Sequence, residues 1–78
     1  MNVEDTVKEI FNQVLDVKPE EIEPDAKLEE SLEVDSTEMV EISVGLKKAL
    51  SVDISDNELK KSHSFNEIVE ILKSKGAN

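Results

Sequence analysis

The sequence predicts an all-α fold: a small helical bundle of three main helices plus one short helix, with a long loop between helices one and two. Apolar residues recur at helical spacing in three separate segments of the 78-residue chain. A residue suited to N-capping precedes each of these segments. Between residues 16 and 34 the apolar period is lost, and Pro19 and Pro24 interrupt the stretch.

The first helix is expected where one apolar stripe recurs at i, i+4, i+7, i+8, i+11 and i+12. Asn2 can cap this helix, and Glu4 and Asp5 suit its first turn. Pro19 lies just past its end. The stripe consists of Val3, Val7, Ile10, Phe11, Val14 and Leu15.

Acidic residues dominate the connection that follows, which is long for a compact domain and therefore suggests a functional role. We expect four apolar residues to anchor it to the core: Ile22, Ala26, Leu28 and Leu32. In this arrangement the connection crosses the bundle and leads to Ser36.

The second helix is expected over residues 36–50, with Asp35 as N-cap and Glu38 completing a capping box. Gly45 inside it costs about 1 kcal/mol relative to alanine, which indicates either a close helix approach or room for a chain inside the bundle. The inner side is predicted to comprise Met39, Val40, Ser43, Val44, Leu46 and Leu50.

Two further capping boxes follow. Ser55-x-x-Glu58 predicts the short helix, running to about Lys61, and Ser64-x-x-Glu67 opens the last helix. Gly76 can terminate that helix. Its inward residues are predicted to be Phe65, Ile68, Val69, Ile71 and Leu72.

Composition limits the functional classes. Nineteen acidic against nine basic residues give a net charge of −10, which disfavours binding to nucleic acid or anionic lipid and favours basic protein partners. No apolar run is long enough to span a membrane, and no signal peptide is recognisable. We expect a single domain over residues 1–78, monomeric and cytoplasmic, without disulfides because cysteine is absent.

Common catalytic and metal motifs are missing. The only histidine, His63, lies in no motif that would activate a serine, and no Gly-x-Ser-x-Gly sequence is present. A calcium loop starting at Asp53 fails at Glu58, where glycine is required, and at Ser64, where glutamate should bind the ion. These observations disfavour a serine hydrolase and a metal site.

Ser36 is the only serine preceded by an aspartate, and it falls in the first turn of the second helix, where its hydroxyl is expected to be exposed. A phosphodiester formed there would lie near free N–H groups and the positive end of the helix dipole. An Asp-Ser pair before a helix can equally serve as a simple cap.

The wider pattern resembles the acyl carrier protein family, which attaches 4′-phosphopantetheine to the serine of an Asp-Ser-Leu motif at the start of its second helix. The matching residues are Asp35-Ser36-Thr37, the loop start at 17–22, the approach from Leu28 to Leu32, and Val52-Asp53-Ile54. The resemblance implies that a phosphopantetheinyl transferase adds the group to Ser36 from coenzyme A. It also implies a carrier of acyl thioesters among fatty acid, polyketide or related lipid synthesis enzymes. Such a carrier is a substrate of those enzymes and is not itself an enzyme.

The resemblance further implies roles for residues around Ser36. Asp35 and Thr37 would flank the attachment point. Partner-facing residues would be Glu38, Glu41, Lys47 and Lys48, and an acyl cavity would be lined by Met39, Val40, Val44 and Leu59.

Four departures from the family pattern leave the pathway open. Thr37 replaces the usual leucine, Glu33 stands where glycine is usual, Lys47-Lys48 replace acids, and Ser55 replaces a proline. The alternative function is an unmodified acidic helical adaptor that binds proteins only.

Overall fold

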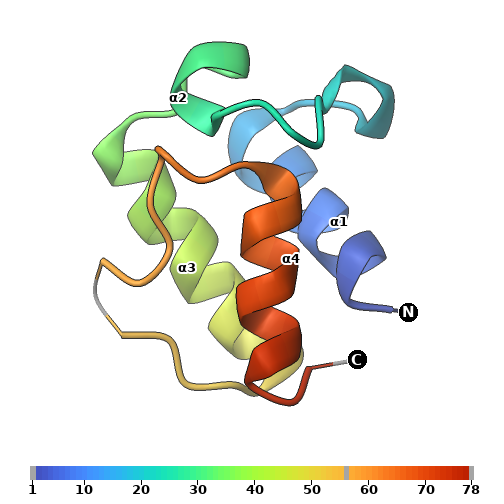
Figure 1. The fold of residues 1–78 in the computed structure, drawn as a ribbon, viewed down its shortest axis with the longest axis vertical. Helices are drawn as coiled ribbons and strands as arrows, with labels where there is room; N and C mark the ends of the chain where they lie inside the picture. The colour runs from blue at the N-terminus through green and yellow to red at the C-terminus, as the bar shows by residue number, and fades with distance from the viewer. Residues whose placement is uncertain (1, 56, 78) are drawn as a thin grey trace.

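The fold class is confirmed by the computed structural model, which describes residues 2–55 and 57–77 (Figure 1). There are three long helices, and the connection between the first two contains a 3-10 turn and one short α-helix. The described residues contain no β-strand, only an isolated antiparallel bridge between Lys27 and Ser64. The elements are α1 (Val3–Leu15), η1 (Pro19–Glu21), α2 (Leu28–Ser31), α3 (Ser36–Leu50) and α4 (Phe65–Ser74).

Helix α1 packs against both α3 and α4, so the core lies on its apolar stripe. Val3, Val7 and Phe11 are completely buried, as the sequence predicted. The Phe11 ring meets Phe65 of α4 edge-to-face, with centroids 6.0 Å apart and ring planes at 84°. Such a pair contributes about 0.5–1.5 kcal/mol beyond its buried area.

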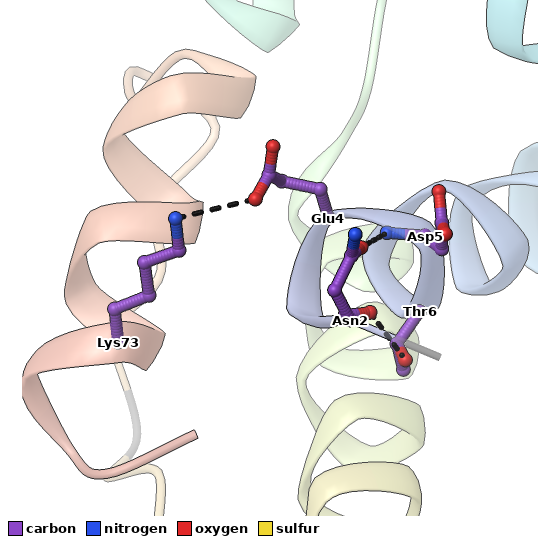
Figure 2. Close-up of polar contacts among 5 residues, drawn as sticks. All are labelled: Asn2, Glu4, Asp5, Thr6 and Lys73. Atoms are coloured by element: carbon purple, nitrogen blue, oxygen red, sulfur yellow. Dashed lines mark hydrogen bonds and ion pairs between the residues drawn. The ribbon is translucent and has the colours of Figure 1, made fainter. Parts of the chain in front are cut away.

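The predicted cap of α1 is present (Figure 2). Asn2 Oδ1 accepts a hydrogen bond from the Asp5 N–H at 2.8 Å, and the Thr6 hydroxyl donates to the Asn2 carbonyl at 3.1 Å. Glu4 in the same turn pairs with Lys73 of α4, with Oε1 and Nζ 3.2 Å apart. Since both of these side chains are about half exposed, the ion pair adds little stability.

The long connection is anchored by side chains and by its backbone. Leu28 is fully buried and Ile22 nearly so, while Ala26 and Leu32 are half-buried. The Leu28 N–H donates to the His63 carbonyl at 3.0 Å. The Leu28 amide, at the start of α2, has no partner within that helix. The segment before α4 provides its acceptor, the His63 carbonyl.

The same segment and the first turn of α4 make three more hydrogen bonds with the connection. The Glu29 N–H donates to the Lys61 carbonyl at 2.9 Å, and the Asn66 N–H donates to the Pro24 carbonyl at 3.0 Å. The Asn66 side chain also donates to Asp25 Oδ1 at 2.7 Å. The loop therefore has a fixed path to the start of α3.

The predicted position of the short helix is wrong. The described residues between 55 and 61 form turns and bends, and the short helix is α2 instead. Asn57 has φ +67°, outside the right-handed helical region. Glu58 Oε1 does accept from the Ser55 N–H at 3.0 Å, but the Glu58 N–H donates to the Ser55 carbonyl rather than to its hydroxyl. Asp56, inside the predicted helix, lies outside the described residues.

The predicted inner side of α3 is partly wrong. Met39 and Leu46 are buried, but Val40 is 63% and Val44 44% exposed, and the fully buried Ile42 was not predicted to face inward. The buried residues follow i, i+3 and i+7, and this stripe faces α1. The prediction from the sequence was therefore correct for the bounds of this helix and wrong for the centre of its buried face.

The two glycines have different roles. A Cβ added at Gly45 would lie 3.2–3.3 Å from side-chain atoms of Ile10, so the first of the two predicted reasons, close helix approach, applies to α1 and α3. Gly76 has φ +94° and lies just past α4. Its N–H donates to the Lys73 carbonyl and that of Ala77 to the Leu72 carbonyl, the pattern of a Schellman motif.

Candidate functional site

The start of α3 is held by the predicted capping box. The Glu38 N–H donates to Asp35 Oδ1 at 2.8 Å, and the Asp35 N–H donates to Glu38 Oε1 at 3.0 Å. This reciprocal pair fixes the residue at which the helix begins. That residue is Ser36.

Ser36 and Thr37 are both exposed at the first two positions of α3. The amide of Glu38 is used by the cap, and the amide of Met39 donates to the Asp35 carbonyl at 3.0 Å. The amides of Ser36 and Thr37 precede the first intrahelical bond and make no hydrogen bond to the described residues. A phosphodiester on the Ser36 hydroxyl would therefore find two free donors at the positive end of a 15-residue helix.

The chain turns into this site through Glu33, which has φ +54°. This left-handed conformation is the one glycine adopts freely. Val34 then enters the core with 3% exposure, and its N–H donates to the Leu28 carbonyl at 3.4 Å. The turn places Asp35 and Ser36 on the surface directly after a buried residue.

A pocket of about 410 Å³ lies between α3 and residues 54, 55 and 57–62, and Ser36 is among its lining residues. Figure 1 shows residues 57–62 passing α3 on their way to the start of α4. All four residues predicted for an acyl cavity line it. Met39 and Leu59 are buried beneath it, while Val40 and Val44 are exposed at its rim.

The residues predicted to face partners are distributed over different surfaces of α3. Glu41 is exposed and Glu38 is half-buried in the capping box. Lys47 and Lys48 are both exposed, but Lys47 lines the pocket beside Ser36, whereas Lys48 lines a second pocket next to Gly45. The structure therefore separates two lysines that are adjacent in the sequence.

Several pocket residues were missed by the sequence reasoning. Ile54 contributes apolar surface, and Glu29, Lys60 and Lys61 contribute charge. The one sequence signal for this charge is the Lys60-Lys61 pair, since basic residues are few in this acidic chain. Its place beside Ser36 could not be foreseen, because it depends on how the loop before α4 folds.

One ion pair connects the wall of this pocket to the end of α4. Glu58 Oε2 lies 2.7 Å from Lys75 Nζ, and both side chains are largely covered. The hydrogen bond from Lys75, followed by that from the Ser55 backbone, holds the pKa of Glu58 below its usual value. Glu58 stands between Asn57 and Leu59, which line the pocket, so the pair restrains that wall.

Residues 2–55 and 57–77 contain neither a metal-binding cluster nor a membrane-spanning helix. No group of three or more side chains there could hold a metal ion. In the same part of the chain, no helix has the length and apolar character needed to cross a membrane.

Comparison with known proteins identifies the family. Residues 5–72 match the family model described as a phosphopantetheine attachment site. The chain is 31% identical over 74 residues to an acyl carrier protein of Buchnera aphidicola subsp. Acyrthosiphon pisum (strain 5A), covering 95% of this chain and 92% of that protein. It is 30% identical over 74 residues to the acyl carrier protein of Wolinella succinogenes, covering 95% and 97%.

The family membership has direct consequences. The prosthetic group is 4′-phosphopantetheine, covalently attached, and the partners include a phosphopantetheinyl transferase and acyl-handling enzymes. The predicted absence of enzyme activity is confirmed for the same reason. Fold, free amides at the start of α3 and sequence likeness agree, and the chain therefore belongs to the acyl carrier protein family, as a carrier rather than a catalyst.

Proposed function

We propose that Ser36 is the attachment residue and that the protein carries acyl thioesters among the enzymes of fatty acid, polyketide or related lipid synthesis. The observation that carries this proposal is the position of Ser36. Its exposed hydroxyl stands at the first residue of a capped helix, beside two free amides and on the lining of a pocket. The family match favours this function over an unmodified adaptor.

The residues around Ser36 then have separate tasks. Asp35 and Glu38 hold the start of the helix, so the hydroxyl is presented in one position. The amides of Ser36 and Thr37 donate to the phosphodiester. When attached, the group supplies a thiol that holds the acyl chain as a thioester.

The pocket is proposed to receive the acyl chain. Met39, Val40, Val44 and Leu59 provide its apolar surface, and each Å² of apolar area withdrawn from water contributes roughly 25 cal/mol. Because Val40 and Val44 are exposed at the rim, a chain that covers them removes apolar surface that the protein alone leaves in water.

Partner enzymes are proposed to bind the surface around Ser36. Thr37 and Glu41 are exposed there, and the net charge of −10 suits partners with basic surfaces. Thr37 presents a small hydroxyl where the family usually presents leucine, so we propose that it alters partner choice. The monomeric state and the cytoplasmic location remain predictions from the sequence.

The attachment residue is tested by intact mass. Incubation with coenzyme A, magnesium and a broad-specificity transferase should add one phosphopantetheine to the wild type and none to Ser36→Ala. Ser43→Ala is the matched control, because Ser43 lies on the same helix and the same pocket, and it should be fully modified. Full modification of Ser36→Ala would disprove the assignment. Protein isolated from its own cell without any added mass would favour the adaptor.

A further inference from the structure

The described lining of the pocket beside Ser36 is positively charged, although the chain as a whole is acidic. Of the lining residues that the structure describes, three are lysines, namely Lys47 from α3 and Lys60 and Lys61 from the facing segment, and one is acidic, Glu29. Three positive charges and one negative charge give a local balance of +2 in a chain of net charge −10. A third of the nine basic residues of the chain thus surround this one pocket.

Among the described residues, none forms an ion pair with these lysines. In the part of the chain that the structure describes, the ion pairs are Glu4 with Lys73 and Glu58 with Lys75. Neither involves a lysine of the pocket. Polar groups of Ser43, Ser55, Asn57 and Ser62 line the same space, so the pocket offers donors as well as apolar surface.

The lining residues of α3 form a stripe that starts at Ser36. Val40, Val44 and Lys47 follow it at intervals of four, four and three residues, so all four lie along one side of the helix. At 1.5 Å per residue, Lys47 stands about 16 Å along the axis from Ser36. The stripe passes from the hydroxyl, over two valines, to an ammonium group.

From this arrangement we propose that the cargo is an acyl chain that carries a carboxylate at or near its far end. The inference rests on the proposed attachment at Ser36 and narrows the class of cargo. The hydrocarbon portion covers Val40 and Val44, and the carboxylate pairs with Lys47, supported by Lys60 and Lys61 across the pocket. A plain hydrocarbon chain would make no use of these three charges and would have to displace water from around them.

The test compares two cargoes of equal length on the phosphopantetheine arm: an octanoyl group and the mono-thioester of octanedioic acid. Melting temperatures are measured at low and high salt for the wild type and for Lys47→Gln. Lys47→Gln should lower the melting temperature of the carboxylated form by about 2–4 °C more than that of the octanoyl form, and salt should reduce this difference.

Lys48→Gln is the matched control. It makes the same charge change at the adjacent exposed residue, which lines the other pocket, and it should affect both cargoes equally. Combining Lys47→Gln with Lys60→Gln and Lys61→Gln should enlarge the difference between cargoes without altering the octanoyl form further.

Three results would overturn the proposal. If Lys47→Gln and Lys48→Gln act alike on both cargoes, the lysines contribute only general charge. If the Lys60 and Lys61 changes destabilise the thiol form and every loaded form equally, the lysines bind the phosphodiester of the arm instead. If no group can be loaded at Ser36, the proposed function fails as well, and this outcome is distinguished by the absence of added mass.

Discussion

Replacing Glu33 by glycine should stabilise the turn that leads into Ser36. Glu33 has φ +54°, a conformation that costs a residue with a Cβ about 1–2 kcal/mol. Glycine avoids this cost but loses about 0.5–1 kcal/mol more conformational entropy on folding. The middle values of these two ranges leave a net gain in the free energy of unfolding of about 0.5–1 kcal/mol.

A gain of that size is measurable in a 78-residue domain. It should raise the melting temperature by about 2–8 °C, since 1 kcal/mol corresponds to roughly 4–8 °C at this chain length. Because Glu33→Gly also removes one of nineteen acidic residues, charge relief must be separated from backbone relief. Glu33→Ala makes this separation, since it removes the same charge and keeps the Cβ.

The assay is thermal and urea unfolding of the unmodified protein at moderate salt, where charge repulsion is screened. Glu33→Gly should exceed Glu33→Ala by the predicted 0.5–1 kcal/mol, and both variants should still be modified at Ser36. Equal stabilities for the two variants would refute the reasoning, because the left-handed turn would then cost glutamate no more than glycine.

Three further predictions concern charge. Glu58→Gln should lower the free energy of unfolding at neutral pH, because the pKa of Glu58 is lowered in the folded protein. The difference in this free energy from the wild type should shrink between about pH 5 and pH 3, where the wild-type carboxylate takes up its proton. The melting temperature of the wild type should rise from low to moderate salt, and a melt indifferent to salt would show that the net charge of −10 is already neutralised by local pairing. Lys47→Glu with Lys48→Glu should speed association with generic fatty acid synthesis enzymes and slow association with a partner that presents acids, measured as acyl-transfer rate against salt. Equal responses from both enzymes would contradict this last expectation.

The three long helices could be predicted because their signals are local. Each has a run of apolar residues at helical spacing and a capping residue whose bond to the first turn is present in the structure. The Ser64 hydroxyl, for example, accepts from the Glu67 N–H at 3.2 Å, as the capping box requires. Both halves of such a box involve residues three apart, so no knowledge of the tertiary fold is needed.

The segment from Ser55 to Lys61 shows where local signals fail. It has the same capping-box sequence, and one of the two bonds forms. Asn57 nevertheless has a left-handed backbone conformation, and Glu58 pairs with Lys75 at the end of α4. A contact between residues seventeen apart in sequence cannot be read from spacing.

The buried face of α3 was misjudged for a related reason. Apolar residues occupy a wide arc of this helix, since Ile42 lies about 160° around it from both Val40 and Val44 at roughly 100° per residue. Which part of the arc is buried depends on where α1 lies. Ile42 is covered by the core, and the two valines are left at the rim of the pocket.

The two lysines at the end of α3 also occupy surfaces that their positions in the sequence do not reveal. Because Lys47 and Lys48 are adjacent in the sequence, they were predicted to form one basic patch that a partner enzyme would contact. In the structure they face different pockets, and only Lys47 shares its pocket with Ser36. A change in the acyl-transfer rate with Lys48→Glu alone would therefore report on the docking surface. A change with Lys47→Glu alone would combine the effects on docking and on cargo binding. The two single changes thus separate recognition of the protein from recognition of what it carries, because each alters one charge on one side of the same helix.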